Sequence, residues 1–315
     1  MENSNSNSNP NIQSLLPEDC TEKILSFTSP VDVCRVSLVS KSLQSAADSD
    51  SVWEKFLPSD YQSIISGSVT PIPDFASKKE LYVYLCHNPI LIDAGRKSFS
   101  LEKCTGKKCY ILGARDLHIT WADSPQYWEW TSLPDSRFPK VAKLKQVWWL
   151  EIRGTIRVGV LSPRTSYAAY LVYKLENEFG FHYRPSESEV SIGVLDVKLD
   201  KQFATLLPKG RLPQYGRFYI LSSRAKDGRG IPDDKCESSV ANVVRYWLGK
   251  HLPEDASNIQ LPKLRNDGWF EVELGQFYTE NEDDCLEMSL KEVKDCSSHK
   301  KGLIVEGIEI RPRMG

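Results

Sequence analysis

The stretch Leu-Pro-Glu-Asp-Cys-Thr-Glu-Lys-Ile-Leu-Ser-Phe occupies residues 16–27 and decides how the chain begins. Pro17 suits the first turn of a helix, where its missing N–H leaves no bond unmade, and the two acidic residues after it favour the positive end of the helix dipole. Apolar residues then recur at the spacing of one helix face. They are Cys20, Ile24, Leu25 and Phe27. The stretch therefore predicts a short amphipathic helix.

Further short helices are predicted after it. The sequence Ser-Pro-Val-Asp at residues 29–32 has the pattern of a capping box and predicts the start of a second helix. A third helical turn follows, and Val52, Trp53 and Phe56 form a last apolar group. These helices carry more apolar residues than so small a unit can bury. We therefore expect residues 16–57 to need a partner chain.

The order Leu-Pro, Ile-Leu, Val-Ser-Lys-Ser and Val-Trp within this segment resembles the F-box. That module seats substrate receptors on the Skp adaptor of cullin-type ubiquitin ligases. The resemblance implies that residues 15–58 bind a Skp-type adaptor within an SCF-type (Skp-cullin-F-box) ligase. The residues expected to make this contact are Leu16, Pro17, Ile24, Leu25, Val33, Val36, Leu38, Val39 and Trp53. From the residues alone, a helical subdomain that packs on its own protein remains an alternative.

Length and composition narrow the possible functions. The 315 residues allow about two domains, and 40% hydrophobic residues are enough for a real core. A formal net charge of −2 gives no reason to expect binding to nucleic acid or to an anionic membrane surface. No apolar run approaches the roughly 20 residues of a membrane span. Residues 1–14 are rich in Asn and Ser and predict a disordered tail without a secretory signal.

The eight cysteines are scattered, and their spacing fits neither a disulfide framework nor a zinc site. Cys20 and Cys34 lie on apolar helix faces, which predicts buried free thiols. We therefore expect a reducing compartment, the cytoplasm or the nucleus, and no metal or other cofactor.

The sequence pattern changes near Gly95. Before it, residues 58–75 predict a linker, and Ser-Lys-Lys-Glu at residues 77–80 predicts the capping box of one more short helix, so residues 59–95 form a linker with a helix. After it, apolar and polar residues alternate with period two, without intervening helices. The alternating runs are residues 147–153, 169–175, 190–194, 269–274 and 308–311.

These runs predict an antiparallel β-sandwich, jelly-roll-like, over residues 96–315. The predicted fold class is therefore multidomain, α followed by all-β. Residues 208–262 read as an insertion, with a strand at 217–221 and a helix at 240–248.

Several motifs of this second part carry another resemblance. They are Lys-Cys-Tyr-Ile-Leu-Gly-Ala-Arg at residues 108–115, Ile-Thr-Trp at 119–121, Tyr-Trp-Glu-Trp at 127–130, Trp-Leu-Glu-Ile-Arg-Gly at 149–154, Gly-Trp-Phe-Glu-Val-Glu-Leu-Gly at 268–275 and Gly-Ile-Glu-Ile-Arg-Pro at 307–312. Together with the F-box they are similar to plant F-box proteins of the phloem protein 2-B type, relatives of the Nictaba lectin. The resemblance implies a lectin-type domain that binds N-acetylglucosamine oligomers or the core of N-linked glycans. Its sugar-binding residues would be Trp121, Trp128, Glu273 and Glu280.

The residues themselves leave each of these roles open. Trp121 shares a strand face with Leu117 and Ile119, so it is as well placed for the core as for a stacking platform. Trp128 follows Pro125 in a predicted loop, which favours an exposed ring. Glu273 alternates with Val272 and is expected to point outward. The other tryptophans of this part, Trp130, Trp148 and Trp149, are expected to pack in the core or on the sheet.

Three functions are compatible with the sequence. The first is a non-catalytic SCF substrate receptor that binds glycoproteins. The second keeps the F-box but lets the second domain bind unglycosylated protein. The third is a glycoside hydrolase, because paired carboxylates beside tryptophans occur among residues 269–284. No nucleophile motif, phosphate loop or dinucleotide fingerprint supports any other enzyme.

Overall fold

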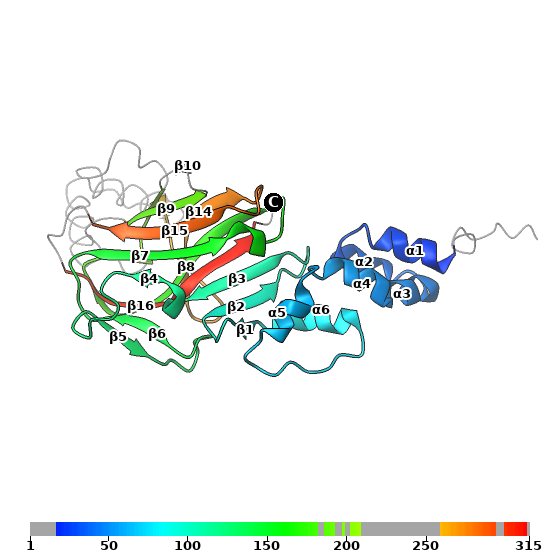
Figure 1. The fold of residues 1–315 in the computed structure, drawn as a ribbon, viewed down its shortest axis with the longest axis horizontal. Coiled ribbons are helices and arrows are strands. Elements are labelled where there is room, and N and C mark those ends of the chain that lie inside the picture. The colour runs from blue at the N-terminus through cyan, green and yellow to red at the C-terminus, as the bar shows by residue number, and fades with distance from the viewer. Residues whose placement is uncertain are drawn as a thin grey trace, which may run out of the picture. The chain divides into compact units, whose positions relative to one another are not determined.

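The computed structural model describes residues 17–181, 186–192, 197–198, 202–208, 259–293 and 299–313. The chain divides into two compact units (Figure 1). The helical unit comprises residues 1–94 and 99–109, and the β unit comprises residues 95–98 and 110–315. The predicted fold class, helices followed by an antiparallel β-rich domain, is confirmed. Among the residues that the structure describes, no helix combines the length and the apolar character needed to span a membrane.

The helical unit is built from short helices, and serine N-cap residues mark where several of them begin. Ser29 accepts a hydrogen bond from the backbone N–H of Asp32, and Ser77 accepts one from that of Glu80, so the serine cap of each predicted capping box is confirmed. The elements of this unit are α1 (Glu18–Leu25), α2 (Pro30–Val36), α3 (Lys41–Asp48), α4 (Asp50–Phe56), α5 (Tyr61–Ser66), α6 (Lys78–His87) and β1 (Ile90–Ile92).

Trp53 is the centre of the core in this unit. Its side chain is 1% exposed, and its ring lies 5.7 Å from that of Phe56 and 5.2 Å from that of Tyr82, a residue of α6. Its indole N–H donates to the carbonyl oxygen of Ala47 at 2.7 Å. Residues 59–94 belong to the same compact unit as the first four helices, and they contain α5, which the sequence did not indicate.

The β unit contains two sheets. From β3 onward, the order in the larger sheet is β3-β16-β8-β14-β13, with β6 paired to β16 and β5 paired to β6. In the smaller sheet the order is β12-β11-β9-β15-β7-β4, with β10 paired to β9. Every pair whose register is described is antiparallel except β11–β12. Strands β2 and β3 contribute residues to both units.

The strands have the following bounds. They are β2 (Lys97–Leu101), β3 (Lys108–Gly113), β4 (His118–Ile119), β5 (Trp128–Thr131), β6 (Val141–Leu144), β7 (Leu150–Arg157), β8 (Ser166–Phe179), β9 (Ser186–Ile192), β10 (Val197–Lys198), β11 (Gln202–Ala204), β12 (Ile259–Gln260), β13 (Lys263–Leu264), β14 (Phe270–Tyr278), β15 (Cys285–Glu292) and β16 (Lys301–Pro312).

The two sheets pack face to face (Figure 1). A Cβ added at Gly154 in β7 would lie 3.1 Å from Ile308 in β16, and one added at Gly275 in β14 would lie 2.7 Å from Val190 in β9. The missing side chains at these two positions thus let the sheets approach closely. The predicted alternation of buried and exposed residues is confirmed in β7 and, over residues 308–311, in β16. In β9 Val190 is buried, but Ser191 and Ile192 are both half-buried. In β8 and β14 the predicted alternation is wrong, because successive residues are buried on both faces of these strands. The strand and the helix predicted at 217–221 and 240–248 lie outside the described residues.

Candidate functional site

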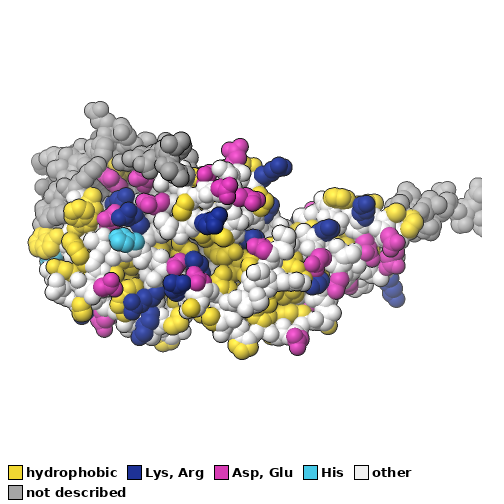
Figure 2. Space-filling model, viewed as in Figure 1, with side chains coloured by type: hydrophobic (Ala, Val, Ile, Leu, Met, Phe, Trp, Pro, Cys, Tyr) yellow, Lys and Arg dark blue, Asp and Glu magenta, His cyan; other side chains and the backbone are white. Residues whose placement is uncertain are grey.

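The helical unit keeps a set of apolar side chains exposed near the ends of its first two helices. The exposed fractions are 55% for Ile24, 81% for Phe27, 87% for Leu38 and 66% for Val39. Phe27 lies in the turn that follows α1, and Leu38 and Val39 lie in the turn that follows α2. We call these four residues the exposed apolar set. Hydrophobic atoms reach the surface of this unit in Figure 2.

Other residues predicted to contact the Skp adaptor have different positions. Leu25, Val33 and Trp53 are buried, at 4%, 0% and 1% exposure, and form the core of the helical unit instead of its surface. Each is covered by neighbouring helices, which helical periodicity alone cannot reveal. Pro17 is exposed, Val36 is half-buried, and Leu16 lies outside the described residues.

The cysteines are likewise only partly as predicted. Cys20 and Cys34 are free thiols, but they are exposed on the faces that were expected to bury them. Cys86 is half-buried, and burial raises the pKa of its thiol to about 12. A thiol with so high a pKa is a poor nucleophile at neutral pH. Within the described ranges, no three His, Cys, Asp or Glu side chains are grouped so as to hold a metal ion.

In the β unit, Trp121 forms an exposed aromatic platform. It lies two residues after the end of β4, its side chain is 45% exposed, and its ring lies 5.2 Å from the ring of Tyr127 at an angle of 38°. Its φ angle is +62°, a left-handed conformation that is a genuine outlier for so bulky a residue. Such a conformation costs on the order of 1–3 kcal/mol and persists only where the surroundings enforce it.

Two other tryptophans enforce it. The indole N–H of Trp128 donates to the carbonyl oxygen of Thr120 at 3.1 Å, and that of Trp130 donates to the carbonyl oxygen of Ala122 at 3.0 Å. The residues on both sides of Trp121 are therefore fixed. The backbone N–H of Thr120 also donates to the carbonyl oxygen of Glu151, at 3.1 Å.

Of the two positions left open for Trp121, the structure shows the exposed one, and the exposed ring expected for Trp128 is wrong. Trp128 is 2% exposed and lies in β5, where its ring holds the Trp121 segment instead of reaching solvent. Pro125 does lie before it in a turn, but the strand begins at Trp128 itself. Trp148 and Trp149, which were expected to pack, are 48% and 42% exposed, because β7 begins only at Leu150.

The two candidate glutamates belong to a different part of the β unit. Glu273 lies on β14 of the larger sheet, is half-buried, and accepts a hydrogen bond from the Gln276 amide at 2.6 Å. Glu280 is exposed in the loop after β14. Trp121 follows a strand of the smaller sheet, and none of the contacts among the described residues joins it to either glutamate.

Glu271, next to the candidate glutamates, is fixed by arginines. Its carboxylate lies 2.6 Å from Arg311 and 3.2 Å from Arg265, and Arg265 also pairs with Glu309. Burial alone would raise the pKa of Glu271, but the guanidinium groups of Arg311 and Arg265 outweigh it and hold that pKa below its ordinary value. Glu271 is therefore an ionised structural anchor, whereas a glycosidase acid needs a raised pKa.

Comparison with known proteins agrees with this architecture. The model of the F-box domain matches residues 14–55, and the model of the Phloem protein 2 family matches residues 107–312. The chain belongs to the F-box proteins of the phloem protein 2-B family. Three members from Arabidopsis thaliana illustrate this. F-box protein PP2-B1 is 41% identical over 94% of this chain and 89% of its own length. F-box protein PP2-B10 is 42% identical over 94% of this chain and 92% of its own length. F-box protein PP2-B15 is 41% identical over 95% of this chain and 96% of its own length.

Membership of this family confirms both predicted resemblances. The matched regions follow the order expected from the motifs, with the F-box in the helical unit and the phloem protein 2 region starting near β3. The chain is thus an F-box protein of a kind consistent with a substrate adaptor.

Proposed function

We propose that this chain is the substrate-recognition subunit of an SCF-type ubiquitin ligase, and that its helical unit binds a Skp-type adaptor. The observation that carries the proposal is the exposed apolar set. Ile24, Leu38 and Val39, three of the residues that the F-box resemblance implied, present more than half of their side-chain surface to solvent. Burying a side chain of this size contributes roughly 1.5–3 kcal/mol.

The lengths of the helices support the same conclusion. α1, α2 and α3 have eight, seven and eight residues, and isolated helices of that length are marginal in water. A partner chain that covers their exposed ends would stabilise them. The chain itself makes and breaks no bond in this mechanism. It acts by proximity, because a tethered target has a high effective concentration beside the conjugating enzyme.

Co-purification tests the adaptor role. We expect the full chain to bind a Skp-type adaptor and Leu38→Asp with Val39→Asp to weaken binding more than about 100-fold, since two side chains then bring charge into an apolar contact. Val69→Asp is the matched control, because Val69 is 50% exposed elsewhere in the helical unit. Undiminished binding by the double variant, with the same thermal unfolding as wild type, would contradict the proposal.

For the β unit we propose glycan recognition through Trp121. An exposed indole held rigidly beside Tyr127 offers a flat apolar face to the C–H groups of a sugar ring, and little conformational freedom is lost when the ring packs there. Trp128 takes a positioning role in this proposal, since it fixes the carbonyl of Thr120. Glu273 and Glu280 stay candidate hydrogen-bond acceptors for more distant parts of a glycan.

A glycan array with the full chain tests this second role. We expect binding to N-acetylglucosamine oligomers or N-glycan cores, and its loss in Trp121→Ala. Binding to no sugar would favour the alternative in which the β unit recognises unglycosylated protein. Hydrolysis of the same oligomers would instead indicate a glycosidase. The lowered pKa of Glu271 argues against that outcome.

The site of action that we propose is the cytoplasm or the nucleus. Cys20 and Cys34 are free and exposed, which suits a reducing compartment. Imaging of the full chain fused to a fluorescent protein tests this, and a secreted product would contradict it.

A further inference from the structure

A second group of aromatic rings lies at one end of the β unit. The ring of Trp148 stands edge-on to the ring of His299, with centroids 5.6 Å apart. The ring of Phe179 stacks on the same His299 ring, with centroids 4.7 Å apart. Trp148 is 48% exposed and Phe179 is 37% exposed. The three residues come from the segment before β7, the last residue of β8 and the segment before β16. We call them the aromatic trio.

The backbone beneath the trio is firmly held. Val147 and Lys300 exchange two backbone hydrogen bonds, of 2.9 and 2.6 Å. The ammonium group of Lys300, whose side chain is 1% exposed, donates to the carbonyl oxygen of Trp148 at 3.2 Å and lies 3.0 Å from Glu292. Removing either charge would leave a buried ion without its partner, so the pair fixes this segment.

Glycine fixes the third ring. Gly180 follows Phe179 directly and has a φ angle of +90°. A Cβ at that position would collide with the carbonyl oxygen of His299. Only glycine therefore allows the end of β8 to pass against the segment that carries His299. The trio is thus a rigid, partly exposed surface with no flexible aliphatic side chain among its members.

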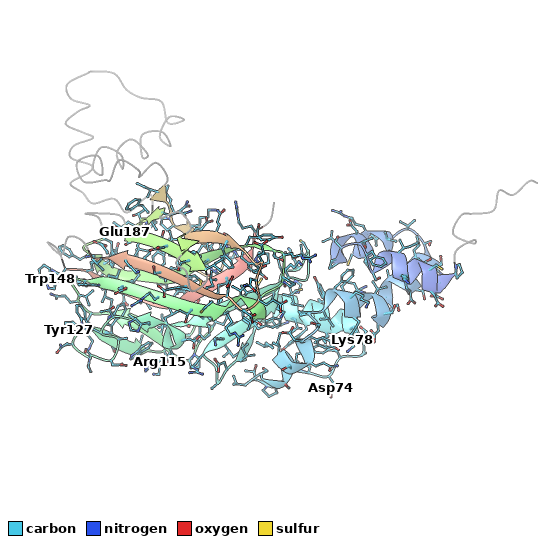
Figure 3. The ribbon with its side chains drawn as sticks, turned by 45° about the horizontal axis from the view of Figure 1, so that its top comes forward. Asp74, Lys78, Arg115, Tyr127, Trp148 and Glu187 are labelled. Carbon is cyan, nitrogen blue, oxygen red and sulfur yellow. The ribbon has the colours of Figure 1, made fainter. Side chains whose placement is uncertain are left out.

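The backbone of Tyr127 is hydrogen-bonded to the segment that leads to the trio. The carbonyl oxygen of Tyr127 accepts hydrogen bonds from the backbone N–H groups of Lys145 and Gln146, at 2.8 and 3.4 Å. These two residues directly precede Val147 and Trp148 in the chain. Tyr127 and Trp148 accordingly lie at the same end of the β unit (Figure 3).

We propose that Trp148, Phe179 and His299 form a second sugar-ring subsite, so that the β unit binds an oligosaccharide across two aromatic platforms. This inference rests on the proposed glycan binding at Trp121. Each platform offers a flat apolar face to the C–H groups of one pyranose. The His299 ring nitrogens add hydrogen-bonding capacity beside the second face. Two linked contacts on one ligand raise affinity only when the ligand is long enough to reach both.

Calorimetric titration with N-acetylglucosamine oligomers, from the monomer to the pentamer, tests the inference on the full chain. We expect affinity to rise with length, and Trp148→Ala to lower the affinity for the long oligomers about tenfold, to the level of the short ones. Trp148→Phe keeps an aromatic face and should retain most of the gain. Phe179→Ala supplies a second test from another segment, and thermal unfolding confirms that each variant is folded.

The matched control is Tyr278→Ala. Tyr278 is 50% exposed and pairs with Ser166 at the start of β8, whereas Phe179 ends the same strand. If wild type binds all lengths equally, or if Trp148→Ala binds long oligomers as wild type does, the second subsite is refuted and the proposed function stands. An equal loss for short and long oligomers would assign Trp148 to the first platform and also refute the inference. Binding to no oligomer would refute both.

Discussion

The helical unit and the β unit both leave large apolar side chains in solvent, but they differ in which residues they leave and how they hold them. In the helical unit the most exposed of these side chains are Ile24, Phe27, Leu38 and Val39, near the ends of short helices. In the β unit five of them are aromatic: Trp121, Trp148, Trp149, Phe179 and Tyr278. The first set is mostly aliphatic and the second is built of flat rings.

The surroundings of the two sets differ as well. Phe27, Leu38 and Val39 follow helices through ordinary turn hydrogen bonds. Trp121 is fixed by two indole N–H groups, and the Trp148 segment is fixed by a buried lysine. Aliphatic side chains at helix ends suit the apolar surface of another chain. Rings fixed in advance suit a small rigid ligand, because binding then costs little conformational entropy.

The largest expected effect tests whether the helical unit separates its core from its contact surface. Trp53→Ala should destabilise this unit by about 3–5 kcal/mol, because it empties a buried site and leaves the carbonyl of Ala47 without its donor. Thermal unfolding followed by helical circular dichroism measures the loss. Leu38→Ala, at an 87% exposed position, should change stability by less than about 0.5 kcal/mol. Similar losses for both variants would show that the distinction is wrong.

Trp128 offers the corresponding test in the β unit. Trp128→Ala should cost about 3–5 kcal/mol, since its ring is 2% exposed. Trp128→Phe is more informative, because it keeps an aromatic ring and most of the volume while it removes the N–H that holds Thr120. We expect it to cost about 1 kcal/mol of stability and to weaken sugar binding as well. Normal sugar affinity in that variant would remove the positioning role of Trp128.

What the sequence could predict depended on how local the cause was. The caps at Ser29 and Ser77 each need a partner three residues away, and both form as predicted. The alternation in β7 and in the last part of β16 follows from one periodic pattern within each strand. Apolar character in α1 and α2 was also evident. The sequence did not show which of these apolar side chains are covered by neighbouring helices. Buried Leu25 and exposed Ile24 therefore could not be told apart.

The candidate site was harder, because its causes are not periodic. Trp121 leaves the expected face through a left-handed backbone angle, which no alternation pattern can show. Trp148 shares the parity of Leu150 and Ile152, but it precedes the strand. Glu271 has the parity of an outward residue and is nevertheless 8% exposed, because Arg265 and Arg311 cover it. Its partners are separated from it by six and 40 residues in the sequence.

A smaller, pH-dependent effect on stability is expected from the ion pairs that Glu271 makes in the β unit. Glu271→Gln should destabilise the β unit by about 1–3 kcal/mol at pH 7, because it leaves two half-buried arginines with less compensating charge. The pKa of Glu271 is lower in the folded state, so its stabilisation is present above the ordinary carboxyl value of about 4.3 and is lost as pH falls through the folded value.

Denaturant unfolding at pH 7 and at successively lower pH measures this difference. Wild type and Glu271→Gln should converge in acid, since a protonated carboxyl resembles an amide. Glu280→Gln is the control: this glutamate is exposed, and its loss should change stability by less than about 0.5 kcal/mol at any pH. A gap between wild type and Glu271→Gln that stayed constant with pH would show that the arginines do not act through its charge.

The smallest expected effect has an unusual sign. Trp121→Ala and Trp121→Gly both remove the ring and its contact with Tyr127, so their difference isolates the left-handed backbone at φ +62°. Glycine adopts that conformation freely, whereas alanine is strained there. We therefore expect the glycine variant to be the more stable by about 0.5–1 kcal/mol, although glycine is ordinarily the poorer residue because of its unfolded-state entropy. Denaturant unfolding of the two variants decides the sign. If alanine were the more stable, the indole would be exposed without backbone strain, and Trp128 and Trp130 would have no constrained segment to hold.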